Sequence, residues 1–378
     1  MNEPIRIGIL YSRHGAYGAI GRDCCDGATL AIEHLAARGI AVEPVFADPG
    51  GEGPRYIDIA RDLMRSGGCR HIVGTILSAS RKEVIPLVEK HDGLLWYIAP
   101  YEGFEANENV IYTGTCPNQH LLPLFDHLVP RHGNRVFLLG ANYVWGWEMN
   151  RLARELLHRT GGTVAGERFL PIEEVEIGRL VAEIEAARPS FVLNNLIGPS
   201  SYALLEAMHA LGQRDATFRP ETCPVVSCDL TECELGEIAP GAATGQLAAA
   251  CYFDSIDTAE NRAFKAAIAA RFGAGRRVSS FFASAYTAVE LCAGAILAAG
   301  SDEPAAVRRA LTARPHRTVE GTMRIDPETN HATLPFYLGR INDGGGFDII
   351  AARPAIAADP YLTGSRGQRT APHLRVVS

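Results

Sequence analysis

The chain has 378 residues and a mass of 40.7 kDa, which is more than one ordinary compact domain and indicates about two domains. Apolar residues make up 47% and charged residues 21%, so the chain can bury sizeable cores and is not disordered. The formal net charge of −7 argues against direct binding of DNA or RNA, because phosphate binding needs a basic face.

Short apolar runs alternate with helical patterns along the first third of the chain. We expect strands at Ile5–Tyr11, Ala41–Phe46, His71–Ile76, Leu94–Ile98 and Val110–Tyr112. The predicted helices between them are Asp23–Arg38, Ile57–Met64 and Arg81–Lys90. Strands that alternate with helices at this spacing predict a parallel sheet with helices on both faces.

The same pattern restarts near residue 135 and predicts a second α/β unit. We expect its strands at Arg135–Leu139, Thr163–Leu170, Phe191–Leu196 and Pro224–Cys228. Helices are predicted at Trp147–His158, Ile177–Ala187 and Tyr202–Leu211, then at Ala259–Phe272, Ser280–Leu297 and from Glu303. The final runs, Gly321–Ile325, Leu334–Ile341 and Phe347–Ile350, are typical of antiparallel strands joined by turns.

No linker rich in Pro, Gly or Ser separates the two units, whose junction falls near Gly114–Pro117. The sequence therefore predicts two lobes hinged about a cleft, each a parallel sheet with flanking helices. Ligands of open α/β sheets bind outside the carboxyl ends of the strands, which would face this cleft.

Motifs for cofactors, metals and catalysis are weak in this chain. The run Gly15–Gly21 has the spacing G-x-x-G-x-x-G rather than that of a dinucleotide fingerprint, which favours a ligand-facing loop or a simple turn. Cys223, Cys228 and Cys233 are five residues apart, whereas zinc ligands prefer pairs two to four apart. No G-x-S-x-G elbow occurs. We expect no cofactor, no metal and no catalytic residue.

The cysteines and the N-terminus bear on the compartment. Met1–Pro4 leads straight into the first strand without a basic segment and an apolar segment before a cleavage site. The chain has nine cysteines, several inside apolar runs, as in reduced core positions. These features predict a cytoplasmic protein. The alternative is a periplasmic protein whose leader has been removed from the chain.

Neutral hydrogen-bonding and aromatic side chains follow several predicted strands. The third strand leads into Ser78-Ala79-Ser80, where Ser80 is placed to cap the helix from Arg81. The fourth leads into Tyr97-Ile98-Ala99-Pro100-Tyr101, and the second unit adds Asn142-Tyr143-Val144-Trp145 and Asn194–Gly198. Aromatic rings, hydroxyls and backbone N–H groups at one cleft predict a small polar pocket with hydrophobic walls.

The chain as a whole resembles the type I periplasmic-binding-protein fold family. Within it, the chain is most similar to the amide-sensing regulators of aliphatic amidase operons (the AmiC type) and to urea and short-chain-amide binding proteins. The motifs that carry the resemblance are Asp48-Pro49-Gly50-Gly51, Val73-Gly74 to Ser78-x-x-Arg81-Lys82, Pro100-Tyr101-Glu102-Gly103-Phe104-Glu105, Pro117-Asn118-Gln119 and Tyr252 to Thr258.

The resemblance implies a non-catalytic sensor whose chain crosses three times between two lobes. We therefore place residues 1–115 plus 253–320 in the first lobe and residues 116–252 plus 321–378 in the second. The resemblance also suggests which residues contact the ligand. Ser78, Tyr97 and Tyr143 match ligand-contacting positions, whereas Ile76, Ala99 and Trp145 replace two tyrosines and a threonine of the family pattern. Together with Ile197 and Asp229 they form our predicted site. Asp229 stands where the amide sensor has a neutral residue, and an acidic group there is what an amino-acid receptor uses for the ammonium group. The competing interpretation is that Asp229 caps a helix near Thr231.

Two functions follow from the resemblance. The first is a sensor of an amide or urea-like molecule that regulates an amidase-type operon through a partner such as an RNA-binding antiterminator. The alternative is the substrate-binding protein of an ABC importer for amides, urea or branched-chain amino acids. Neither function needs direct contact with nucleic acid. Both functions are compatible with a homo-oligomer.

Overall fold

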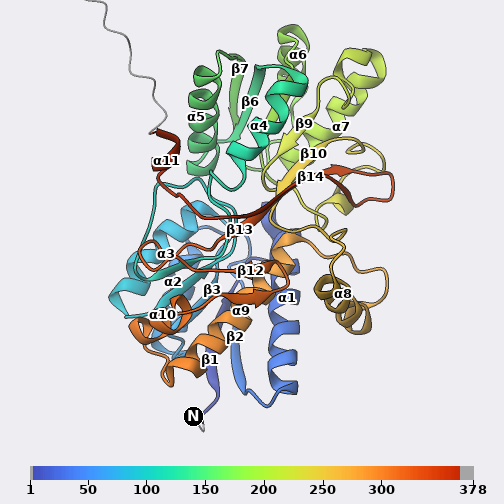
Figure 1. The fold of residues 1–378 in the computed structure, drawn as a ribbon. Helices are drawn as coiled ribbons and strands as arrows, with labels where there is room; N and C mark the ends of the chain where they lie inside the picture. The colour runs from blue at the N-terminus through green and yellow to red at the C-terminus, as the bar shows by residue number, and fades with distance from the viewer. Residues whose placement is uncertain (1–2, 367–378) are drawn as a thin grey trace, which may run out of the picture.

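The computed structural model describes residues 3–366 and divides them into two α/β halves, one above the other in Figure 1. The lower half holds a five-stranded parallel sheet with the order β2-β1-β3-β4-β5. Its strands are β1 (Ile5–Leu10), β2 (Val42–Ala47), β3 (His71–Gly74), β4 (Leu94–Tyr97) and β5 (Val110–Tyr112). Its helices are α1 (Gly18–Ala37), α2 (Arg55–Arg65) and α3 (Ser78–Lys90).

The upper half holds a seven-stranded sheet with the order β14-β13-β10-β9-β8-β6-β7. Five of its strands are parallel: β6 (Arg135–Ala141), β7 (Thr163–Leu170), β8 (Phe191–Asn195), β9 (Val225–Ser227) and β10 (Leu247–Ala250). The strands β13 (Leu334–Ile341) and β14 (Phe347–Ile356) join antiparallel, as the sequence predicts. The helices are α4 (Leu121–His132), α5 (Val144–Arg159), α6 (Gly178–Ala187) and α7 (Pro199–Arg214).

After β10 the chain returns to the first sheet. It forms α8 (Ala259–Phe272), α9 (Ser280–Ala299), α10 (Pro304–Thr312) and a small hairpin of β11 (His316–Thr318) and β12 (Gly321–Met323), and the described chain ends with α11 (Thr363–Arg366). Helix α9 packs along α1 and α10. The lobe boundaries that we predict at residues 115/116, 252/253 and 320/321 stay a prediction, and residues 1–2 and 367–378 lie outside the described part.

Helix α9 is long and apolar enough to cross a membrane, with a mean hydropathy of 1.6 in its most apolar window. About 72% of that window is buried inside the protein. A helix that is apolar all round suits the core of a large protein as well as a membrane span. Its packing against α1 therefore identifies α9 as a core helix, as the sequence indicates.

Both sheets have the same strand order around their first strand. β1 lies between β2 and β3, and β6 lies between β7 and β8. Connections from β1 and β3 therefore leave the first sheet on opposite faces, and the same holds for β6 and β8. A crevice forms at the carboxyl ends of the strands where the order reverses, and ligands bind there.

Five helices begin earlier than the sequence predicts, namely α1, α2, α3, α5 and α7, and the shifts of α1 and α3 change an interpretation. Helix α1 starts at Gly18, because the G-x-x-G-x-x-G run forms a tight turn followed by helix. A Cβ at Gly21 would lie 1.7 Å from the Ser12 carbonyl oxygen, so only glycine allows this close approach. Helix α3 starts at Ser78, and Ser80 lies inside its first turn. The prediction that Ser80 caps this helix is therefore wrong.

Candidate functional site

A cavity lies where the strand ends of the two sheets meet. In this closed arrangement it has a volume of about 20 Å³ and receives side chains from the loops after β1, β3, β4, β6 and β9 and from the start of α9. Its lining residues are Tyr17, Ile20, Ile76, Ser78, Ala99, Pro100, Tyr143, Trp145, Asp229 and Phe281. The cavity is therefore built by both halves of the molecule.

Six of the eight residues predicted from the sequence line this cavity: Ile76, Ser78, Ala99, Tyr143, Trp145 and Asp229. Tyr97 and Ile197 are buried but are not among the lining residues. The Tyr97 hydroxyl donates to the Ile76 carbonyl oxygen at 2.7 Å, and its ring packs under the Arg81 guanidinium. In this arrangement Tyr97 supports the loop that carries Ile76. Its direct contact with a ligand stays a prediction.

Four further lining residues are not among those predicted from the sequence: Tyr17, Ile20, Pro100 and Phe281. Tyr17 and Ile20 belong to the glycine-rich run after β1, and its interpretation as a ligand-facing loop pointed toward them. Pro100 follows Ala99 in the loop after β4. Phe281 stands near the start of α9, far along the chain, and no local pattern indicates that it reaches the cleft.

The two halves touch each other at the edge of the cavity. The hydroxyls of Tyr17 and Tyr143 lie 2.5 Å apart and share a hydrogen bond. Beside them, a Cβ at Gly198 would lie 2.3 Å from the Ala16 carbonyl oxygen. Since one partner of each contact comes from the loop after β1 and the other from the second sheet, the structure shows the lobes closed around the cavity.

Asp229 faces the cavity and does not cap a helix. The chain turns at 232–234 and forms only a short 3-10 turn at Leu235–Glu237, so the interpretation as a helix cap is wrong. Its Oδ1 accepts a hydrogen bond from the Ser227 hydroxyl at 2.5 Å. Burial raises the pKa of Asp229 to about 7, although the Ser227 hydrogen bond partly opposes the shift. The side chain keeps partial access to the cavity.

Ser78 belongs to a buried ionic network. Its hydroxyl donates to Glu102 Oε2 at 2.6 Å, and Arg81 Nη1 donates to the Ser78 oxygen at 3.2 Å. Arg81 also binds Glu102 Oε1 and Glu105 Oε1, each at 2.8 Å. All of these residues lie in the motifs that carry the family resemblance. The network therefore holds Ser78 at the cavity wall. Its hydroxyl proton is already donated to Glu102.

Trp145 supplies an unused hydrogen-bond donor at the cavity. Its side chain is 3% exposed, and its indole N–H has no hydrogen-bond partner among the described residues. A buried polar group without a partner is costly, so such a group in a native structure calls for an explanation. A bound molecule with an oxygen acceptor would satisfy the indole N–H.

The described residues contain no group of three or more His, Cys, Asp or Glu side chains that could hold a metal ion. The cavity combines one free N–H donor, one carboxyl group and a wall of aromatic rings. This arrangement can hold a compact polar molecule by hydrogen bonds and apolar contact.

The chain belongs to the periplasmic binding protein family, because the model of the periplasmic binding protein domain matches residues 5–366. The match covers nearly all of the described chain. The narrower resemblance to amide-sensing regulators is not confirmed by the comparisons.

Three solved structures with this fold are transporter binding proteins. One is a solute-binding protein of an ABC transporter from Rhodopseudomonas palustris HaA2 in complex with p-hydroxybenzoic acid, with a TM-score of 0.85, 20% identity and coverage of 96% of this chain and 100% of that chain. Another is an amino acid ABC transporter substrate-binding protein from Pseudomonas fluorescens Pf-5, with a TM-score of 0.81, 20% identity and coverage of 96% and 98%.

A third is the branched-chain amino acid transporter substrate-binding protein LivJ from Streptococcus pneumoniae in complex with isoleucine, with a TM-score of 0.78, 16% identity and coverage of 93% and 99%. At these identities the likeness shows the shared two-lobed fold. Among curated proteins, limonene hydroxylase from Geobacillus stearothermophilus is 27% identical over 122 residues. That match spans 32% of this chain and 22% of the other protein.

Proposed function

We propose that this protein binds one compact polar molecule between its lobes and releases it unchanged, as the substrate-binding component of an ABC importer. The observation that carries the proposal is the closed cavity at the strand ends, with the free indole N–H of Trp145 and the carboxyl group of Asp229 on its wall. The solved structures of the same fold, which are binding proteins of ABC and amino-acid transporters, support the importer role.

The class of ligand follows from Trp145 and Asp229, because the hydroxyls of the other polar lining residues bond within the protein. Trp145 requires an acceptor, such as a carbonyl or carboxylate oxygen, whereas Asp229 favours an ammonium group or a strong N–H donor. A small zwitterionic amino acid supplies both groups, and an amide or urea supplies their neutral counterparts. A benzoate has no cation for Asp229 and would bring a second negative charge toward it.

Isothermal titration calorimetry with isoleucine, acetamide, urea and 4-hydroxybenzoate tests this proposal. We expect binding of isoleucine, acetamide or urea, no heat with 4-hydroxybenzoate, and recovery of the ligand chemically unchanged. Binding of 4-hydroxybenzoate alone would contradict the assigned ligand class, and turnover of the bound amide would contradict the non-catalytic function.

A second candidate function is the cytoplasmic amide sensor that acts on a partner such as an antiterminator. The nine cysteines favour it, because all of them are free and seven are buried, which suits a reducing compartment. Cell fractionation combined with thiol titration in denaturant without reductant distinguishes the two functions. Nine reactive thiols in a cytoplasmic fraction support the sensor, whereas an exported protein with fewer thiols supports the importer.

A further inference from the structure

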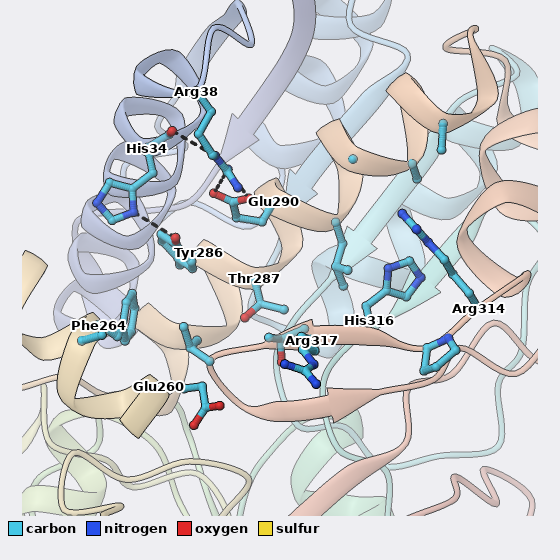
Figure 2. A pocket seen from close by; sticks show the side chains of 18 of the residues that line it. His34, Arg38, Glu260, Phe264, Tyr286, Thr287, Glu290, Arg314, His316 and Arg317 are labelled. Atoms are coloured by element: carbon cyan, nitrogen blue, oxygen red, sulfur yellow. Dashed lines mark hydrogen bonds and ion pairs between the residues drawn. The ribbon is translucent and has the colours of Figure 1, made fainter. Parts of the chain in front are cut away.

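A larger hollow lies away from the cavity between the lobes, on the first half of the molecule. It has a volume of about 700 Å³ and is enclosed by α1, α8 and α9, with α10 and the strand β11 closing the other side. Figure 2 shows the side chains around it. Small-molecule sites in proteins have volumes of roughly 300–1,000 Å³ and mostly apolar walls, and this hollow has both properties.

The floor of the hollow is apolar and includes an unusual glycine. Phe264 of α8 and Leu291 of α9 contribute buried side chains. Gly294 lies in the middle of α9, and a Cβ built there would meet no atom within 4 Å. Glycine inside a helix is less favourable than alanine, and packing of the described residues does not require it here. Its effect is to leave open space in the hollow.

The charged groups at one end of the hollow are neutralised within the protein. Arg38 donates to the carboxylate of Glu290 at 2.5 Å, and His34 Nδ1 lies 2.9 Å from the Tyr286 hydroxyl. Figure 2 shows both pairs as dashed contacts on neighbouring turns of α1 and α9. This end therefore offers little net charge to a bound molecule.

The opposite end carries unpaired positive charge. Arg314 and Arg317 line the hollow, and neither guanidinium group has an ion-pair or hydrogen-bond partner in the part of the chain that the structure describes. His316 stands between them and uses its Nε2 on the Leu311 carbonyl oxygen at 2.7 Å. The exposed carboxylate of Glu260 on α8 is the remaining acidic group of the lining.

A buried hydroxyl lies at the back of the hollow. Thr287 of α9 is 2% exposed and lines the hollow, where Figure 2 places it between the two charged ends. The buried Glu320 carboxyl lies beside it and accepts from its hydroxyl, so Thr287 forms part of the wall and uses its donor within the protein.

We propose that this hollow is a second ligand-binding site, separate from the cavity between the lobes, for an apolar molecule that carries one carboxylate or sulfonate group. The apolar floor would hold its hydrocarbon or aromatic part, and Arg314 and Arg317 would bind its anionic group. The site does not depend on the proposed importer or sensor function, because no residue is shared between the two cavities.

Fluorescence titration with 8-anilinonaphthalene-1-sulfonate, an apolar sulfonate, tests the proposal on the full chain. We expect one bound probe per chain and at least tenfold weaker binding after the double substitution Arg314→Gln/Arg317→Gln. We also expect Gly294→Phe to abolish binding, because a Cβ at this position meets no atom within 4 Å and the new ring would take up space in the hollow. The matched control is Gly178→Phe on α6, where a Cβ also meets no atom within 4 Å, and it should bind the probe normally.

A neutral probe and the oligomeric state complete the test. N-phenyl-1-naphthylamine lacks the sulfonate, so we expect at least tenfold weaker binding that the double substitution does not change. Equal binding of both probes, or unchanged sulfonate binding by Gly294→Phe, would overturn the proposal. Conversion of a dimer to a monomer by Gly294→Phe in analytical ultracentrifugation would also overturn it, because the hollow would then be an interface between copies of this chain.

Discussion

Asp229 determines whether the cavity prefers amino acids or plain amides as ligands. Burial raises its pKa to about 7, and the carboxyl group faces the cavity. We expect Asp229→Asn to lose roughly 2–5 kcal/mol of affinity for isoleucine, as truncation of one side of a buried charge pair does. Acetamide should bind both proteins equally. Equal isoleucine affinity in calorimetry of parent and variant would contradict an ammonium contact.

The same residue predicts a pH dependence of binding. An ammonium group requires ionised Asp229, and the carboxyl is protonated below its pKa of about 7 in the empty cavity. Isoleucine affinity should therefore rise by up to about tenfold per pH unit below pH 7 and level off above it. Asp229→Asn should show no such rise, and a sloping profile in that variant would assign the effect to another group.

The indole N–H of Trp145 permits a second test at the scale of one atom. Trp145→Phe keeps the aromatic wall and removes an unpartnered buried donor. We expect no loss of unfolding free energy, but isoleucine affinity should fall by about 1.5–3 kcal/mol, the usual range for a hydrogen bond to a charged group. Unchanged affinity would show that the ligand lies elsewhere in the cavity.

At the scale of one element, the start of α3 depends on the ionic network beneath it. The side chains of Arg81 and Glu102 are 0% and 2% exposed and lie 2.8 Å apart. Arg81→Met leaves buried carboxylates without their main cation and should cost about 3–5 kcal/mol of unfolding free energy. Urea denaturation measures the loss.

The double variant Arg81→Met/Glu102→Gln serves as the control for this network. It removes the buried charge pair together, and we expect it to recover part of the loss, because two neutral side chains need no counter-ion. Additive losses in the two single variants and the double variant would show that the residues act independently.

For the whole molecule, buried titratable groups predict an unusual stability profile. Burial raises the pKa of Asp229 to about 7 and of Glu232 to about 8, so the folded protein holds protons that the unfolded chain has released. Stability therefore falls as the pH rises through these values, by at most about 1.4 kcal/mol per pH unit for each group. Burial lowers the pKa of His71 and His120 to about 4. These histidines therefore change the unfolding free energy only below about pH 6.5, where the unfolded chain begins to protonate them.

Urea denaturation at pH 6.5, 7.25 and 8 tests this profile. We expect the unfolding free energy to decrease across the series, and Glu232→Gln should flatten the decrease because its side chain cannot titrate. The Glu232 carboxylate accepts one backbone hydrogen bond from Asp254 at 2.8 Å, and its other oxygen has no partner among the described residues. A free energy that rises with pH would show that both carboxyls are ionised in the folded protein.

The sequence by itself determined the class of fold and most of the wall between the lobes. Alternating strands and helices are local patterns, and the carboxyl ends of parallel strands meet at one edge, so Ser78, Tyr143, Trp145 and Asp229 could be placed together. The restarted α/β pattern and the family resemblance both predicted the two-lobed arrangement, which the family match and the solved structures confirm.

Only the tertiary structure decided which side chains meet across long stretches of chain. Tyr17 and Tyr143 are 126 residues apart and share a hydrogen bond because the lobes close on each other. Phe281 reaches the cavity because α9 returns to the first sheet, and the hydroxyl of Tyr97 is taken by a backbone carbonyl. These contacts depend on how whole elements pack, and the periodicity of a single segment carries no information about its neighbours in space.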